Sequence, residues 1–156
     1  MWPCLGKVFK CYDTEFTNQG EPMNRNIKEG LRWLDQAKMD FKTAKDCIKD
    51  GNFYASAFFA QQSAEKALEG FLYSKGLRAL ITHSVLDLVE EASKSQENFR
   101  KFIDFGRELD KHYIGSRYPN FYPSGAPYKY YTKEVAEKCV SYAELILEEV
   151  KNYLEK

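Results

Sequence analysis

The stretch FYASAFFAQQSAEKALEGFLYSKG at residues 53–76 combines small, apolar and glycine residues in a pattern that decides the fold class. Its apolar positions recur at steps of three and four residues, which is typical of one face of an α-helix; they are Ala57, Ala60, Ala64, Leu68 and Leu72. The alanines allow another helix to approach closely, and Gly76 ends the pattern. We therefore predict a helix that packs against other helices.

A similar stripe precedes this stretch and predicts a first long helix that ends at Gly51. Its apolar members are Leu31, Leu34, Ala37, Phe41, Ala44 and Ile48. No part of the chain shows the strict alternation of apolar and polar residues that is typical of a half-buried strand.

Three more helices are expected after residue 76. Ser84 and Asp87 resemble a capping box at the start of a shorter helix, residues 97–113 predict a fourth, and Thr132 suits the N-cap of the last. Short connections between long amphipathic helices are typical of antiparallel bundles. We predict an all-α, antiparallel up-and-down bundle of about five helices.

The length and charge of the chain limit the kind of protein it can be. A chain of 156 residues fits one domain, which we place at residues 23–156, with residues 1–22 as an N-terminal extension outside the periodic pattern. Lysine plus arginine equals aspartate plus glutamate at 23 each, so no general basic field favours nucleic acid or a membrane surface. Without a signal peptide or a membrane span, we expect a cytoplasmic protein.

The cysteines and histidines do not predict a metal site or a cofactor. Cys4, Cys11, Cys47 and Cys139 form no CxxC pair, and only two histidines are present. Cys47 and Cys139 stand among apolar residues at helical spacing, so we expect small buried hydrophobic side chains there. A pairing of Cys4 with Cys11 conflicts with a reducing cytoplasm.

The segment RYPNFYPSGAPYKYY at residues 117–131 cannot be a continuous helix, because it contains three prolines and a glycine. Two interpretations of its aromatic residues stay open. The rings can cover the core as a lid, with their hydroxyls in water. Alternatively Arg117, with Tyr113, Tyr118 and Lys129, can form a surface for phosphate contact and base stacking.

The placed helices resemble the HEPN family of small helical-bundle domains. The resemblance rests on GLRWLDQAKMDFKTAKD in the first helix, residues 53–76 in the second, THSVLDLVEEA in the third and LDKHYIGSRYPN before the aromatic loop. It covers about residues 26–155. The second helix and the segment from Tyr113 to Pro119 are its most specific parts.

The resemblance implies a helical bundle, frequent homodimerisation and a role in handling nucleotides or RNA. Many members of the family act beside a minimal nucleotidyltransferase in toxin–antitoxin-like systems, and we expect that partner class here. Some members are metal-independent ribonucleases with an Arg-x4–6-His motif, generally completed at a dimer interface. A dimerisation module without catalysis is the third alternative.

Arg107 and His112 match the ribonuclease motif as Arg-x4-His, with Arg107 as the phosphate clamp and His112 as the acid/base group. Five residues of α-helix place two side chains roughly 140° apart around the axis. Convergence therefore requires the helix to end between them or a second subunit to supply one of the pair. Arg117 has no histidine after it and cannot begin the motif.

Other polar residues permit more modest roles. His83 precedes a helix and suits the turn into it, and Glu65 and Glu69 suit surface charges. Gln61 and Gln62 interrupt an apolar run, and a buried glutamine needs hydrogen-bond partners. One of them is therefore expected to bridge helices or to contact the loop.

Overall fold

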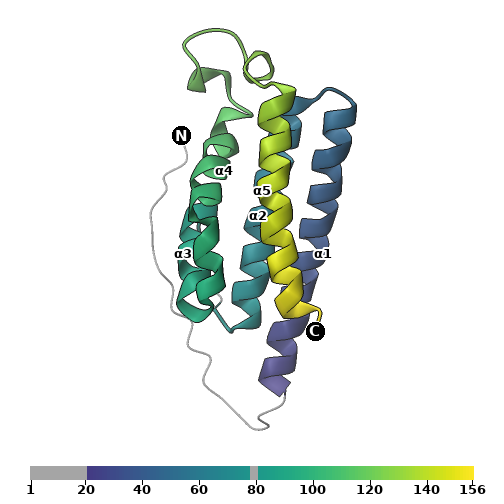
Figure 1. Cartoon of the computed structure of the whole chain (residues 1–156), viewed down its shortest axis with the longest axis vertical. Helices are drawn as coiled ribbons and strands as arrows, with labels where there is room; N and C mark the ends of the chain where they lie inside the picture. The colour runs from purple at the N-terminus through teal and green to yellow at the C-terminus, as the bar shows by residue number, and fades with distance from the viewer. Residues whose placement is uncertain (1–20, 78–80) are drawn as a thin grey trace.

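Two long antiparallel helices begin the bundle. The structure is a computed structural model that describes residues 21–77 and 81–156, with helix α1 at Glu21–Lys49 and α2 at Phe53–Ser74 (Figure 1). Gly51 and Gly76 have φ angles of +75° and +82°, a conformation that glycine adopts at little cost. Both glycines therefore end their helices as the sequence predicts.

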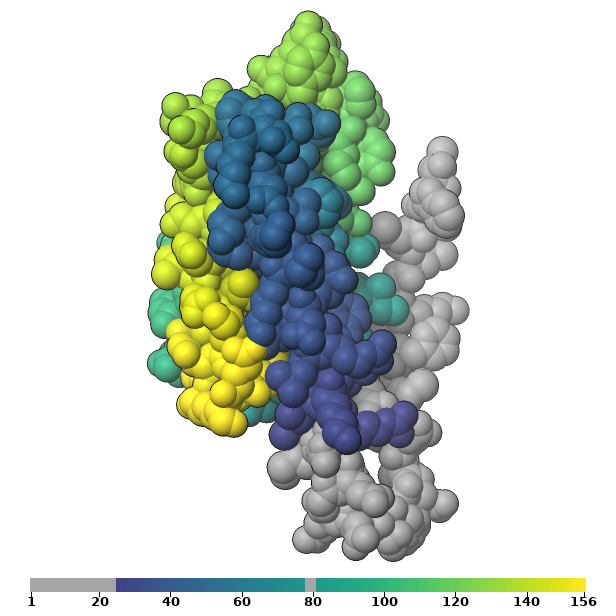
Figure 2. All heavy atoms as spheres, turned by 90° about the vertical axis from the view of Figure 1, so that its right-hand side faces the viewer, coloured from purple at the N-terminus to yellow at the C-terminus, as the bar shows by residue number. Residues whose placement is uncertain are grey.

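Three further helices complete the bundle: α3 at Val85–Ser95, α4 at Ile103–Gly115 and α5 at Lys133–Leu154. Short 3-10 helices lie between them, η1 at Glu97–Phe102, η2 at Pro119–Phe121 and η3 at Pro127–Lys129. All five α-helices run nearly along the long axis of the molecule (Figure 1), and α1 lies beside α5 on one face (Figure 2). Residues 21–77 and 81–156 contain no β-strand, so the predicted all-α bundle of five helices is confirmed.

The predicted helix starts hold in two places. The Ser84 hydroxyl accepts a hydrogen bond from the Asp87 amide at 3.1 Å, and the Thr132 hydroxyl accepts one from the Val135 amide at 3.3 Å. Each bond satisfies an amide that the helix itself leaves without a partner.

The prediction of one continuous helix over residues 97–113 is wrong. Residues 97–102 form the 3-10 turn η1, and α4 begins only at Ile103. A 3-10 turn has three residues per turn, so Phe99 and Phe102 lie on the same side of η1. Both rings are buried in the core. Packing of these two aromatic rings is thus our physical explanation for the tighter turn.

A glycine pair allows α1 and α2 to approach closely. A Cβ atom at Gly30 would lie 2.5 Å from the carbonyl oxygen of Gly70, and one at Gly70 would lie 2.7 Å from that of Gly30. Alanines fill much of the same interface, because Ala37, Ala60 and Ala67 are fully buried. The small residues of the fold-deciding stretch therefore act as the sequence predicts.

Helix α1 begins close to residue 23, the predicted start of the domain. Residues 1–20 of the expected extension, with Cys4 and Cys11, lie outside the described residues, whereas Glu21 and Pro22 begin α1.

The two cysteines in the helices differ in burial. Cys139 is fully buried, and burial raises the pKa of its thiol to about 12, while Cys47 is only half-buried. None of the described helices combines the length and apolar character that a bilayer crossing requires.

Candidate functional site

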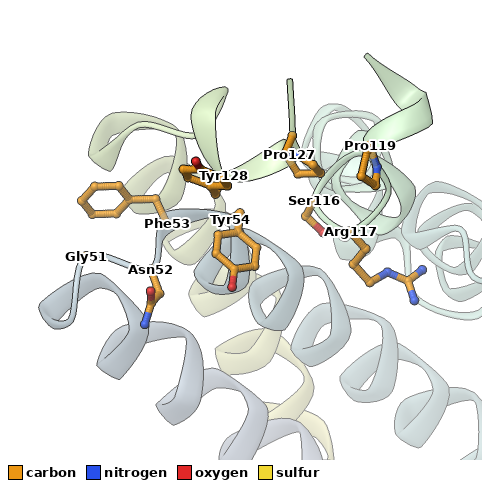
Figure 3. A pocket seen from close by; sticks show the side chains of 10 residues that line it. Gly51, Asn52, Phe53, Tyr54, Ser116, Arg117, Pro119, Pro127 and Tyr128 are labelled. Atoms are coloured by element: carbon orange, nitrogen blue, oxygen red, sulfur yellow. The ribbon is translucent and has the colours of Figure 1, made fainter. Parts of the chain in front are cut away.

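The aromatic loop and the α1–α2 turn enclose a cleft at one end of the bundle. Its volume is about 610 Å³. Gly51, Asn52 and Phe53 line one end of this cleft, and Arg117 and Pro119 line the other (Figure 3). Segments more than sixty residues apart in sequence therefore meet around one hollow.

Arg117 is held at this cleft by backbone and aromatic contacts. Its Nε donates a hydrogen bond to the carbonyl oxygen of Tyr113 at 2.7 Å. Its guanidinium carbon lies 4.4 Å from the ring centroid of Tyr113, 4.8 Å from that of Phe58 and 5.0 Å from that of Tyr118. Cation–π packing of this kind holds the guanidinium plane in place and leaves other N–H groups available for binding.

The acidic residues nearest in sequence to Arg117 have other partners. Asp110 accepts hydrogen bonds from the Ser84 hydroxyl and the Val85 amide, both at 2.6 Å. Glu108 pairs with Lys111 at 2.9 Å. Among the described residues, no carboxylate lies within ion-pair distance of the Arg117 guanidinium. No carboxylate of residues 21–77 or 81–156 therefore neutralises its positive charge.

The structure brings three of the four predicted phosphate-site residues together. Tyr113 and Tyr118 both contact the Arg117 guanidinium. Lys129 lies exposed on η3 and is not among the residues that line the cleft. The predicted surface therefore centres on Arg117.

The tyrosines of the loop divide into an inner and an outer set. The Tyr122 hydroxyl donates to the carbonyl of Gly115 at 2.8 Å, and its ring stacks on Tyr130 at a centroid distance of 4.0 Å. Tyr131 is buried and shares a 2.8 Å hydrogen bond with His112 Nδ1. Tyr118 and Tyr128 are exposed. The loop therefore both covers the core and presents aromatic rings to solvent.

Arg107 and His112 lie on the same helix, α4, but in different surroundings. Arg107 is exposed and forms an ion pair with Asp104 at 2.5 Å. His112 is 8% exposed and packs against the loop through Tyr131. No hydrogen bond joins the two side chains. Within one subunit, the α-helical spacing thus directs them apart, as the geometry of five helical residues predicts.

Burial also changes the acid–base behaviour of His112. Desolvation lowers the pKa of its imidazole, and the nearby Glu108 carboxylate offsets only part of this effect. His112 Nε2 has no hydrogen-bond partner among the described residues, and Glu108 Oε1 lies 3.7 Å away. His112 is therefore a neutral, buried imidazole near neutral pH.

His83 has the opposite environment and a carboxylate partner. Its side chain is 61% exposed, and its Nδ1 lies 3.1 Å from Oε1 of Glu65, which is itself buried. The imidazole stacks on the Tyr113 ring with a centroid distance of 4.6 Å and an interplanar angle of 15°. Tyr113 therefore connects His83 with Arg117.

The two glutamines hold the Glu65 carboxylate. Gln61 Nε2 donates to Glu65 Oε2 at 2.8 Å and to the His83 carbonyl at 3.1 Å, which bridges α2 and the link to α3. Gln62 Nε2 donates to the same carboxylate at 3.3 Å and to Gln61 Oε1 at 2.8 Å. Gln61 thus connects its helix to the link before α3 rather than to another helix or to the aromatic loop, and the expectation of a surface role for Glu65 is wrong.

The sequence interpretation missed the pairing of His83 with Glu65. Glu65 lies on the buried face of α2, and eighteen residues of chain separate it from His83. The available signal was the pair Gln61 and Gln62 inside an apolar run, because buried amides predict a buried polar partner. Residues of the described ranges form no group of three or more histidine, cysteine, aspartate or glutamate side chains arranged to hold a metal ion.

Known proteins share this sequence and this architecture. A protein of Methanocaldococcus jannaschii named "Putative toxin MJ1304" is 30% identical over 139 residues, which cover 84% of this chain and 91% of the relative. The crystal structure of TT1696 from Thermus thermophilus superposes with a TM-score of 0.76 at 31% identity, covering 80% of this chain and 97% of that one.

A second solved structure and a family model agree with these relatives. ST0689, described as an archaeal HEPN homologue, has a TM-score of 0.68 and 33% identity over 81% of this chain and 98% of its own. The model of the HEPN domain matches residues 31–153, from the first helix to the end of the last. The chain therefore belongs to the HEPN domain family.

Proposed function

We propose that this HEPN protein binds the phosphate groups of RNA or nucleotides through Arg117. The observation that carries the proposal is an arginine fixed by Tyr113 and Tyr118, without a carboxylate partner among the described residues, beside a cleft of about 610 Å³. An arginine fork donates two parallel hydrogen bonds to phosphate oxygens, which lysine cannot reproduce. Exposed rings such as Tyr118 and Tyr128 suit the stacking of unpaired bases.

Fluorescence anisotropy of a labelled single-stranded RNA, in buffer with EDTA, tests this proposal. We expect Arg117→Lys to weaken binding by about 10- to 100-fold, because the loss of a charge-assisted contact costs roughly 1.5–3 kcal/mol. Arg100→Lys is the matched control, since Arg100 is exposed, lies on η1 and pairs with Glu97 at 2.9 Å. Its RNA affinity is expected to stay within about twofold of the parent.

Thermal melting of the same variants shows whether Arg117 acts on the stability of the loop instead of on RNA binding. If Arg117→Lys lowers the melting temperature while the folded fraction keeps its RNA affinity, Arg117 only fastens the loop and the proposal fails. ATP and inorganic phosphate are useful second probes, because competition by either one measures how much of the affinity comes from phosphate alone.

A toxin–antitoxin-like role with a minimal nucleotidyltransferase is part of the same proposal. The similarity to a protein named as a toxin supports it. We also propose a homodimer, for which light scattering is expected to give about twice the chain mass of 18.2 kDa. If a small nucleotidyltransferase is encoded beside this chain, co-expression of the two proteins tests the partnership, and their separate elution on a sizing column argues against it.

A metal-independent endoribonuclease that uses Arg107 and His112 is the second candidate. One observation favours it: His112 Nε2 has no hydrogen-bond partner among the described residues, which leaves this nitrogen open for proton transfer. The site would need a second subunit to supply the arginine. RNA cleavage in EDTA that is lost in both Arg107→Ala and His112→Gln supports this candidate. A dimer that neither binds nor cleaves RNA supports a structural dimerisation module instead.

A further inference from the structure

His83 and Arg117 pack on the same aromatic ring. The His83 ring centroid lies 4.6 Å from the Tyr113 centroid and the Arg117 guanidinium carbon lies 4.4 Å from it, so the two groups are at most about 9 Å apart. A phosphodiester and its neighbouring hydroxyl can reach across such a distance with a hydrogen bond of about 2.8 Å to each group. An imidazole and a guanidinium that has no carboxylate partner among the described residues are therefore within reach of a single ligand.

Glu65 fixes the tautomer of His83. Both oxygens of this buried carboxylate accept hydrogen bonds, Oε2 from Gln61 and Gln62 and Oε1 from the histidine ring. A carboxylate cannot donate, so His83 Nδ1 carries the proton and Nε2 carries a lone pair. Gln61 also holds the His83 backbone through its carbonyl. The imidazole is thus oriented by a carboxylate on one side while its other nitrogen stays open.

This arrangement has the parts of a general base. In a carboxylate–histidine pair, the carboxylate sets the ring orientation and stabilises the imidazolium that forms after proton uptake. The His83 side chain is 61% exposed, and among the described residues no group hydrogen-bonds Nε2. Because Arg117 stands across Tyr113, charge on a bound phosphate would have a nearby cation.

We propose that His83 is the catalytic base of a metal-independent RNA-cleaving site in which Arg117 holds the phosphate and Glu65 positions the imidazole. This inference rests on the proposed binding of RNA at Arg117. It assigns the chemistry to the link before α3 and to α2, away from the Arg107 and His112 pair on α4.

The reaction transfers one proton and exchanges one bond at phosphorus. His83 Nε2 takes the proton of a ribose 2′-hydroxyl, the 2′-oxygen forms a bond to the adjacent phosphorus, and the bond from phosphorus to the 5′-oxygen breaks. The leaving oxygen takes a proton from water, and the imidazolium then returns its proton to the hydroxide. The products are a 2′,3′-cyclic phosphate and a 5′-hydroxyl end, so a strand of DNA is not a substrate.

The test follows binding and cleavage of one labelled single-stranded RNA by the full chain in EDTA. We expect His83→Gln to lower the cleavage rate by about 100- to 10,000-fold, the usual contribution of a general base, while RNA affinity changes less than about threefold. We expect Glu65→Gln to lower the rate less than His83→Gln. Arg100→Lys is the control for a surface substitution, and far-UV circular dichroism confirms that each variant is folded.

Rescue separates chemistry from folding. Added imidazole is expected to restore part of the cleavage by His83→Ala, which a purely structural role of His83 would not allow. If the parent binds RNA without cleaving it, this inference is overturned and the binding proposal stays intact. The same holds if His83→Gln cleaves RNA as fast as the parent. Cleavage lost in His112→Gln but not in His83→Gln also overturns it. RNA that does not bind at Arg117 overturns both proposals.

Discussion

The two histidines of this protein occupy opposite environments. His112 on α4 is 8% exposed, hydrogen-bonds the buried Tyr131 and has a lowered pKa because of desolvation. His83 before α3 is mostly exposed and pairs with the buried Glu65. The sequence motif selects His112, whereas His83 packs on the same Tyr113 ring as Arg117, which has no carboxylate partner among the described residues. Spacing along one helix is thus a weaker guide to a site than the contacts between segments.

Asp110 on α4 joins the two regions, and its loss is expected to have the largest effect. It accepts hydrogen bonds from Ser84 Oγ and the Val85 amide at 2.6 Å and from the Leu86 amide at 3.3 Å. Bonds to a charged acceptor contribute roughly 1.5–3 kcal/mol each at most and are not additive. We expect Asp110→Ala to lower the free energy of unfolding by about 3 kcal/mol in urea denaturation.

A matched aspartate on α3 controls this prediction. Asp87 is exposed and accepts one side-chain hydrogen bond from Thr82 at 3.1 Å. We expect Asp87→Ala to cost less than about 1 kcal/mol. Equal effects of the two substitutions would contradict the view that Asp110 joins α3 to α4.

Truncation of each histidine tests directly whether the two side chains differ in their contribution to stability. His112→Ala removes a buried ring and leaves the Tyr131 hydroxyl without its partner, so we expect a loss of about 2 kcal/mol. His83→Ala removes an exposed ring and is expected to cost less than about 1 kcal/mol. Urea titrations of both variants measure the difference, and a larger loss at His83 would reverse our assignment of roles.

A substitution at Gly106 tests whether close packing on α3 fixes the rotation of α4 about its axis. That rotation keeps His112 buried and Arg107 exposed. A Cβ atom there would lie 2.8 Å from the backbone nitrogen and Cα of Leu86 on α3. We expect Gly106→Ala to destabilise the protein by about 1 kcal/mol, since crowding exceeds the gain in helix propensity. The neighbouring Arg107→Ala is the control, with an expected change within about 0.5 kcal/mol. A stabilised Gly106→Ala variant would show that α3 and α4 separate easily.

The pH dependence of stability should distinguish His112. Its folded pKa is lowered from 6.5, so the unfolded chain binds more protons and stability falls as the pH decreases below about 6.5. We expect His112→Gln to reduce this loss between pH 7.5 and pH 5. The measurement is the free energy of unfolding at both values, and an unchanged slope would contradict it.

Glu69, in the region of Glu65, is expected to give an effect of opposite sign. Burial, followed by repulsion from Glu65, raises the pKa of Glu69 to about 7. Its contribution to stability is therefore full below the unfolded pKa of 4.5 and is lost as the pH rises through about 7. The free energy of unfolding of Glu69→Gln, relative to that of the parent, should therefore be lower at pH 5 than at pH 7.5. The same urea titrations measure this, and an equal difference at both pH values would argue against it.

Helix periodicity and end signals were readable from the sequence. The stripe from Ala57 to Leu72, the glycines at 51 and 76, and the caps at Ser84 and Thr132 are local features, and the structure contains each of them. The exception is η1, where the burial of Phe99 and Phe102 accompanies a 3-10 turn in place of a longer α4. A 3-10 and an α-helical pattern differ little over six residues, so only packing decides between them.

The sequence by itself determined the fold class, because residue periods of three and four and the residues at helix ends act over a few neighbouring positions. It also indicated Arg117 with Tyr113 and Tyr118, which stand close along the chain. Only the tertiary structure decided that Glu65 is buried beside His83 and that His112 is buried beneath the loop. These partners come from different segments, and their burial depends on how helices rotate and pack, which no local pattern encodes.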